Sequence, residues 1–340
     1  MKEGLYMARK NDKEQLVSYD NSIKKSNEFS MANLNHGLTL NQMQLLAYSI
    51  YCTQQDGSTE FIKADFERKF GLKRYKTEDA YKDSEKVSAL RYSTQNLEEK
   101  RFRFTAIFTD LQYDNGTFKI EWNQKFVPHI LELKDYYVTT DLTITSKFKS
   151  SFSWTLYEYL KARYGAYYVP VSKEALLRLF GVENRKTYID STAQFKRGVL
   201  DVAINEVNQY TELEVWYKEK KKGRAIVGFE IHWSTGKTVP LATDNQSEEL
   251  RRLIDDVFAL WGVVHQMQNE DNKASATKLV IETEGMRKGK GEQMTSKEAS
   301  EYIPRAKDNL RLIEAFLEYD KQPATTKRVP FYNWLEERDY

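Results

Sequence analysis

The same order of predicted elements, three helices followed by a strand hairpin, occurs twice in this sequence. One copy extends from about residue 39 to 122 and the other from about 151 to 233. The copies share no obvious sequence identity, so the repetition lies in hydrophobic spacing and turn residues. Two copies of one supersecondary order indicate a pseudo-duplicated pair of domains.

The first copy begins with a helix at Thr39, whose side chain fits a capping box with Gln42. A short helix is expected from Lys63 to Phe70, followed by a third from Thr77 to about Glu99. The hairpin has expected strands at Arg101–Phe108 and Thr117–Trp122, and Asp114-Asn115-Gly116 forms the turn. An Asn-Gly pair accepts the positive φ angles of a type I′ turn.

The second copy repeats this order over about 85 residues. Three helices followed by a hairpin, in this order, are typical of a winged helix-turn-helix. The expected helices are Ser151–Tyr164, Lys173–Phe180 and Asp190–Gln209, and the expected strands are Leu213–Tyr217 and Ala225–Trp233, joined by Lys218–Gly223.

The sequence predicts an α+β chain with tandem winged helix-turn-helix domains followed by a mainly helical C-terminal domain. In the C-terminal part, residues 234–248 are expected to form a polar linker, 250–268 and 296–319 helices, and 270–276 and 285–291 loops. Phe331, Tyr332, Trp334 and Leu335 form an aromatic cluster that would anchor a partner or pack on the last helix. The expected division is a flexible arm at 1–30, winged helices at 31–145 and 146–235, and a helical extension at 241–340.

Several classes of function lack their signatures. Cys52 is the only cysteine, which excludes an internal disulfide or a cysteine-rich zinc site. The four histidines show neither metal-binding spacing nor the His-x-His pair of rolling-circle initiators, and no complete P-loop is present. We therefore expect no catalytic residue, no metal and no cofactor.

No apolar run is long enough to cross a bilayer, and the N-terminus lacks an apolar signal region, so we expect a cytoplasmic protein.

The third helix of the second copy has a broad apolar face and a polar face that contains Gln194 and Arg197. In a winged helix this element enters the major groove, where Arg reads guanine and Gln or Asn reads adenine. A solvated face, which every amphipathic helix has, is the alternative interpretation of this helix alone. The candidate DNA-binding residues in the N-terminal half of this helix are Ser191, Thr192, Gln194, Lys196 and Arg197.

The net charge of the chain is only +2, so any signal for DNA is local. Between Arg185 and Arg224 the basic residues exceed the acidic ones by three. A basic wing would lie over phosphates and the adjacent minor groove, and together with an Arg-bearing third helix it favours DNA binding. The candidates in this wing and the loop before the helix are Arg185, Lys186, Lys220, Lys221, Lys222 and Arg224.

The first copy has a weaker basic pattern around its third helix. Asp79, Asp83 and Glu85 balance the charge there, so a plain surface helix is an equal alternative. We expect contacts with DNA phosphates more than base reading. The candidates are Lys73, Arg74, Lys76, Lys82, Lys86 and Arg91.

Several stretches resemble the replication initiators of iteron plasmids over about residues 20–235. In the second copy these are 153–160 (SWTLYEYL), 195–208 (FKRGVLDVAINEVN) and the wing 220–224 (KKKGR) leading into 229–231 (FEI). In the first copy they are 39–51 and 126–131 (FVPHIL). Gly198 stands where many members of the family have a larger residue, and glycine weakens a helix by about 1 kcal/mol relative to alanine.

The resemblance implies a protein that binds direct repeats in double-stranded DNA at a plasmid origin, opens the adjacent AT-rich duplex and recruits a host helicase or helicase loader. Such initiators often repress their own gene as dimers in equilibrium with monomers, and they have no catalytic site. The second domain would read the major groove, while the first would contact the backbone and form the dimer. Residues 241–340 resemble extensions of initiators from low-GC Gram-positive plasmids and would dock a host partner.

Two other functions fit the residues. A tandem winged-helix transcriptional repressor would use the same DNA-binding surface. A replication enzyme, such as a primase or relaxase, would need acidic residues brought together from distant positions, and it would require a divalent metal for nicking or primer synthesis.

Overall fold

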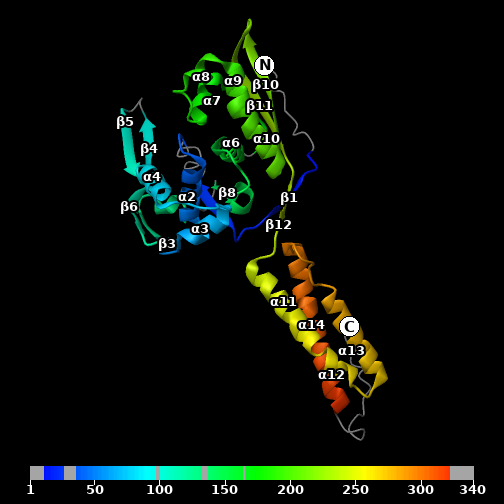
Figure 1. Cartoon of the computed structure of the whole chain (residues 1–340). Helices are drawn as coiled ribbons and strands as arrows, with labels where there is room; N and C mark the ends of the chain where they lie inside the picture. The colour runs from blue at the N-terminus through cyan, green and yellow to red at the C-terminus, as the bar shows by residue number, and fades with distance from the viewer. Residues whose placement is uncertain (1–10, 27–35, 97–99, 132–136, 164, 322–340) are drawn as a thin grey trace. The chain divides into compact units, whose positions relative to one another are not determined.

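The computed structural model describes residues 11–26, 36–96, 100–131, 137–163 and 165–321. The chain forms two compact units, residues 1–239 and 240–340 (Figure 1). Within the described ranges, no helix is both long and apolar enough to cross a membrane.

The first winged helix is built from α2 (Leu40–Tyr51), β3 (Ser58–Ile62), α3 (Lys63–Phe70), α4 (Thr77–Ser88), β6 (Phe108–Asp114) and β7 (Thr117–Trp122). Its sheet has the order β3-β7-β6, and a short 3-10 helix, η1 (Val127–His129), follows. The predicted capping box at Thr39 is present, and Gly71 ends α3 with a left-handed φ of 62°. Asn115 and Gly116 have φ angles of 46° and 90°, which confirms the predicted turn.

Two predictions for the first copy are wrong. The third helix, α4, ends at Ser88 instead of about Glu99, so Arg91 lies at the start of β4 (Arg91–Asn96) and not on the helix. The strand β5 (Arg101–Ala106) pairs with β4 as a separate hairpin, while β7 pairs with β6. The segment after Leu90 contains Tyr, Ser, Thr and Asn, which are weaker helix formers than Ala or Leu, and the pairing of β4 with β5 decides its extended structure.

The second winged helix repeats this topology with a sheet of order β10-β11-β9. In both copies a short strand that was not predicted from the sequence, β3 or β9, precedes the second helix and joins the hairpin. The elements are α6 (Ser151–Lys161), β9 (Tyr168–Ser172), α7 (Lys173–Leu179), α8 (Lys186–Asp190), α9 (Thr192–Phe195), a π-helical turn (η2, Lys196–Leu200), α10 (Asp201–Tyr210), β10 (Leu213–Lys222) and β11 (Ala225–Thr235).

The boundaries of the second copy also differ from the prediction. The helix expected from Asp190 begins at Thr192, because Ser191 caps it with its side chain. The strands are longer than expected, since Lys218–Lys222 belong to β10 and only Gly223 and Arg224 form the turn. Most of the lysines therefore project from a hydrogen-bonded ladder and not from a loop.

The expectation of a flexible arm is wrong for residues 11–26. Strand β1 (Glu14–Val17) pairs with β12 (Lys237–Pro240), and β2 (Ser22–Ser26) pairs with β8 (Tyr137–Asp141), next to α5 (Leu142–Thr145). Lys25 is buried and its ammonium contacts the carboxylate of Glu158 on α6. Pairing with β8 orders this polar segment, and Glu158 supplies the counter-charge that a buried lysine requires.

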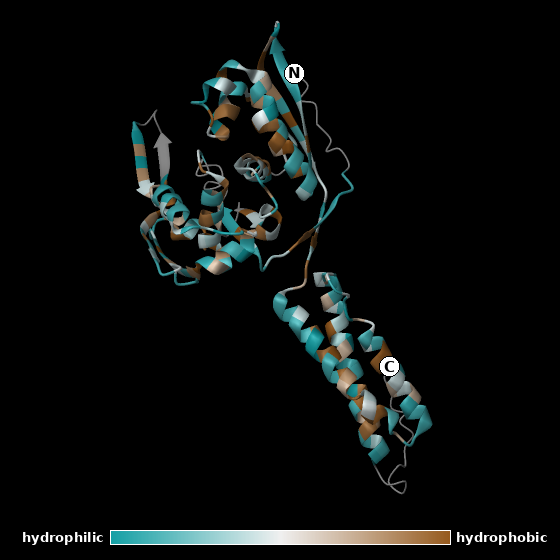
Figure 2. Cartoon of the chain, viewed as in Figure 1, coloured by the Kyte–Doolittle hydropathy of each residue, from teal (hydrophilic) through white to brown (hydrophobic). Residues whose placement is uncertain are grey.

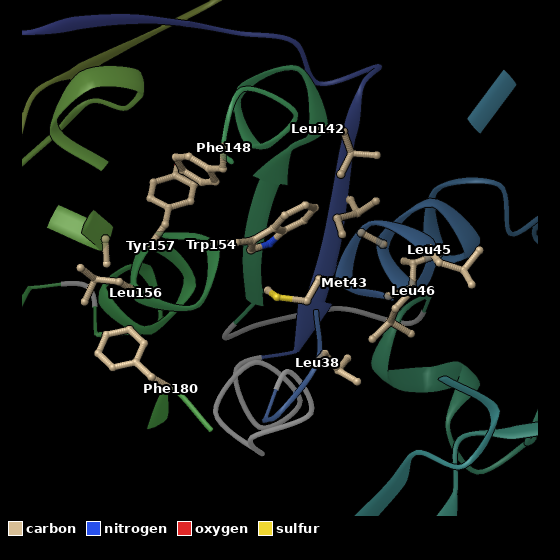
Figure 3. Packing of buried hydrophobic residues seen from close by; sticks show 14 of the residues in the cluster. Leu38, Met43, Leu45, Leu46, Leu142, Phe148, Trp154, Leu156, Tyr157 and Phe180 are labelled. Atoms are coloured by element: carbon tan, nitrogen blue, oxygen red, sulfur yellow. The ribbon is translucent and has the colours of Figure 1, made fainter. Parts of the chain in front are cut away.

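One continuous apolar core joins the two winged helices. The ring of Trp154 on α6 lies 6.4 Å from that of Phe70 on α3. Figure 3 shows Trp154 among Met43, Leu142 and Phe148. The two copies therefore contribute side chains to one common core and are not separate domains joined by a linker.

The C-terminal unit is a helical bundle with its own apolar clusters. Its helices are α11 (Asp244–Ala259), α12 (Trp261–His265), α13 (Glu270–Glu284) and α14 (Ser296–Lys321). The polar linker expected at 234–248 is wrong, because β11 and β12 continue to Pro240 and a capping box at Thr243 starts α11. The loop expected at 270–276 is the start of α13. The aromatic cluster at 331–335 lies outside the described residues.

Candidate nucleic-acid interface

The recognition helix of the second copy comprises α9, the π-helical turn and α10, residues Thr192–Tyr210. The hydroxyl of Ser191 accepts a hydrogen bond from the backbone amide of Gln194 and so begins the helix. Gln194 and Arg197 are exposed, three residues apart on the same face. The opposite face is buried against the sheet and α6 and consists of Phe195, Val199, Leu200, Ala203, Ile204 and Val207.

A π-helical turn over Lys196–Leu200 interrupts the recognition helix beside these polar residues. Such turns are rare, occur mostly as single turns inside α-helices and are frequent at functional sites. Gly198 lies within the turn, and a Cβ atom there would be 3.1 Å from the hydroxyl oxygen of Tyr188 on α8. The absence of a side chain therefore allows α8 to pack closely on the recognition helix, which accounts for the residue that weakens helical propensity.

The second wing, defined as residues Lys218–Arg224, is a long antiparallel ribbon that extends past the helices (Figure 1). Its tip is hydrophilic in Figure 2. Lys220, Lys221, Lys222 and Arg224 are all exposed. A β-bulge between Lys220 and Lys221 shifts the register near the tip, and bulges of this kind redirect side chains.

Glu219 is the one acidic residue of the second wing. Its Oε1 accepts a hydrogen bond from Nζ of Lys196 on the recognition helix at 2.5 Å, and its Oε2 lies 3.3 Å from Nζ of Lys221. The hydrogen bond from Lys196 holds the pKa of this carboxyl below its ordinary value. The carboxylate therefore stays charged at neutral pH and joins the helix to the wing.

Two further contacts attach the hairpin to the recognition helix. The hydroxyl of Tyr217 donates to Oδ1 of Asp201 at 2.9 Å. The side-chain amide of Asn208 binds both the backbone N–H and the backbone carbonyl of Val215, at 2.6 and 2.9 Å. Together with the Glu219–Lys196 pair, these contacts join the recognition helix to the hairpin along its length.

The sequence-predicted residues of the second copy lie in two regions, the segment from Arg185 to Arg197 and the second wing. Arg185 before α8, Lys186 on α8, Gln194 on α9 and Arg197 in the π-helical turn are exposed. The guanidinium of Arg185 lies 5.9 Å from the ring of Tyr188. Ser191, Thr192 and Lys196 are half-buried, the first as a helix cap and the last as the partner of Glu219. Gln194, Arg197 and the wing lysines remain the residues best placed for a ligand.

The candidates of the first copy are all exposed but are more scattered. Lys73 and Arg74 lie in the loop before α4, while Lys82 and Lys86 are one turn apart on it. The predicted residues on these elements are Lys73, Arg74, Lys76, Lys82, Lys86 and, on β4, Arg91.

The side-chain pairs that orient the interface were not predicted from the sequence. In the sequence, Glu219 is one member of a run of charged residues. In the structure, the alternation of side chains along β10 places it on the face of the strand that meets Lys196. The sequence also did not predict the contacts of Tyr188 with Gly198 and of Tyr217 with Asp201, because each contact joins two separate elements. In the described part of the chain, no cluster of three or more potential metal ligands occurs.

Sequence profiles of known families match both winged helices. The profile described as "Initiator Replication protein, WH1" matches residues 22–161, and "Initiator Rep protein, WH2" matches residues 172–233. Together they cover more than half of the chain. The chain belongs to the initiator replication protein family. This confirms the predicted family and the predicted tandem winged-helix fold.

Among solved structures, the chain is similar to one described as "Crystal structure of Pi initiator protein in complex with iteron DNA". The sequence identity is 18%, the TM-score is 0.48, and the match covers 64% of this chain and 98% of the other. No curated protein matches the chain.

Proposed function

We propose that this initiator binds direct repeats, or iterons, in the double-stranded DNA of a plasmid origin through its second winged helix. The observation that carries the proposal is the joined surface of the recognition helix and the second wing. Exposed Gln194 and Arg197 supply groups that hydrogen-bond base edges, and the exposed wing residues Lys220, Lys222 and Arg224 supply phosphate contacts.

We assign backbone contacts and dimerisation to the first winged helix. Its basic candidates surround α4, whose acidic residues outnumber its lysines, so it fits phosphate contact at its edges better than insertion into a groove. Phe102 and Phe104 on β5 are 70% and 65% exposed and contact each other. A two-stranded hairpin is marginally stable alone, and a second copy of the chain packed on these rings would remove them from water.

The remaining steps of initiation complete the proposal. Binding to the repeats promotes opening of the adjacent duplex, and the C-terminal unit docks a host helicase or helicase loader. The dimer, in equilibrium with the monomer, represses the initiator's own gene. None of these steps requires a catalytic residue in this chain. The separate apolar clusters of the C-terminal unit support a distinct docking role, because this unit has its own core.

The deciding experiment measures binding of the purified chain to the origin fragment of its own plasmid and to random duplex, at about 150 mM salt. We expect a preference of about a thousandfold or more and a footprint that repeats at regular spacing. Weak binding without preference would reject the function, although the fold would be unaffected. Nicking or primer synthesis that depends on a divalent metal would instead indicate a replication enzyme.

A further inference from the structure

We propose that Glu219 is a specificity-determining residue of the second winged helix, because it holds Lys196 and Lys221 away from DNA phosphates and fixes the wing against the recognition helix. This inference rests on the proposed function, since it concerns how the same surface separates repeat DNA from random DNA.

The register of the hairpin decides where Glu219 points. Glu219 is paired directly with Phe229 across the β10–β11 ladder, and such partners share one face of a sheet. Phe229 is buried, with its ring 6.2 Å from that of Phe195 on the recognition helix. Glu219 therefore lies on the face that meets the recognition helix, and Lys218 and Lys220 project from the opposite face.

Both oxygens of the Glu219 carboxylate are engaged by cations from two different elements. Oε1 accepts from Lys196 at 2.5 Å and Oε2 lies 3.3 Å from the ammonium of Lys221. The side chains of Glu219 and Lys196 are 24% and 27% exposed, so the pair is only partly screened by water. A phosphate that approaches this corner must compete with the carboxylate for both ammonium groups, and it is repelled by the carboxylate itself.

This competition affects random DNA more than repeat DNA. Binding to random DNA depends almost entirely on phosphate contacts, so each lysine that is withheld weakens it directly. Binding to the repeats also draws on base contacts from Gln194 and Arg197, and these contacts require the recognition helix and wing to keep a fixed orientation. Glu219 thus lowers non-specific affinity while it preserves the geometry of specific binding.

The test compares Glu219→Gln with wild type on two probes, a duplex selected by the wild-type chain from a random library and an unselected random duplex, over a series of salt concentrations. Glu214→Gln is the matched control, since it removes the same charge from an exposed position near the start of the same strand, β10. For Glu219→Gln we expect tighter binding to random duplex and a salt slope steeper by about 0.9 for each lysine released. We expect the ratio of selected to random affinity to fall, because random DNA gains most from released lysines, and Glu214→Gln to leave both quantities unchanged.

Two further variants separate this role from a merely structural one. Glu219→Asp keeps the negative charge and should retain most of the wild-type salt slope. Lys196→Met combined with Glu219→Gln removes one of the released lysines and should reverse about 0.9 of the change in slope. Circular dichroism and thermal unfolding of each variant establish that it is folded.

The outcomes distinguish the two levels of the proposal. If wild type binds both probes equally, the proposed function fails whatever Glu219 does. If wild type discriminates but Glu219→Gln keeps its salt slope and its ratio of affinities, the role of Glu219 is overturned. A loss of affinity that is equal on both probes, with an unchanged slope, also overturns it, because that result reflects damage to the fold.

Discussion

The two winged helices have the same topology but differ in charge at the elements that could meet DNA. In the second copy, the N-terminal half of the recognition helix contains Lys196 and Arg197, and its wing has five basic residues against Glu219. In the first copy, α4 contains four acidic residues against two lysines, and its wing turns through Asp114-Asn115-Gly116. One fold thus supports two surfaces, and surface charge, which the core does not determine, separates the roles that we propose for them.

The copies also differ in what holds the third helix. In the first copy, buried Asp83 on α4 accepts hydrogen bonds from Gln42 and Tyr75, so its polar groups face inward and stabilise the fold. In the second copy, Asp201 binds Tyr217 of the hairpin and Lys196 binds Glu219 of the wing. The contacts of Asp83 hold α4 to its own core, whereas those of Asp201 and Lys196 join the recognition helix to its hairpin.

Neutralising the second wing should produce the largest effect. Changing Lys220, Lys222 and Arg224 together to Gln should weaken binding to every duplex and flatten the salt slope by about 0.9 for each phosphate that the wing no longer neutralises. Fluorescence anisotropy over a salt series measures both quantities. An unchanged slope would show that the wing does not bind phosphates and would remove the main difference between the copies.

Arg197→Ala should have the next largest effect and should act on sequence preference. We expect a loss of about 1–3 kcal/mol on selected DNA, because the guanidinium no longer reaches a base edge, and a smaller loss on random DNA. Lys82→Ala on α4 is the matched change in the first copy and should leave the sequence preference unaltered. Equal losses for Arg197→Ala on both kinds of DNA would refute base reading at this position.

Changing Lys73, Arg74 and Lys76 together to Gln should have a smaller effect than neutralising the second wing. These residues flank an acidic helix, so we expect a modest reduction in salt slope and no change in the footprint sequence. Footprinting and anisotropy on the same fragments provide the measurement. A change in preferred sequence would mean that the first copy reads bases as well, and the comparison between the copies would have to be revised.

Gly198→Ala should have the smallest effect, and it should act on stability. An alanine in a helix contributes about 1 kcal/mol relative to glycine, which alone would raise the melting temperature of a domain of this size by about 2–4 °C. The new Cβ atom would lie 3.1 Å from the hydroxyl of Tyr188, so we expect the gain to be cancelled and α8 to shift. Thermal unfolding measures this, and a full rise of about 2–4 °C would show that the glycine has no packing role.

The elements that local sequence signals specify were predicted correctly. The capping box at Thr39, the left-handed Gly71 and the Asn115-Gly116 turn each depend on neighbouring residues, and the structure contains all three. Hydrophobic spacing likewise predicted the buried face of the recognition helix from Phe195 to Val207. The repeated order of helices and hairpin was therefore readable from the sequence, and with it the family.

Tertiary structure alone decided features in which distant segments meet. Residues 11–26 are polar enough to suggest disorder, but β2 becomes ordered because β8 supplies a partner strand and Glu158 supplies a counter-charge for Lys25. The end of α4 at Ser88 is set by pairing of β4 with β5, which overrides a continuous helical spacing. The position of Glu219 between the wing and Lys196 depends on the hairpin register. Local sequence determines helix caps and turns because the groups that satisfy them lie a few residues away, whereas strand partners and ion pairs are chosen only when the whole chain has packed.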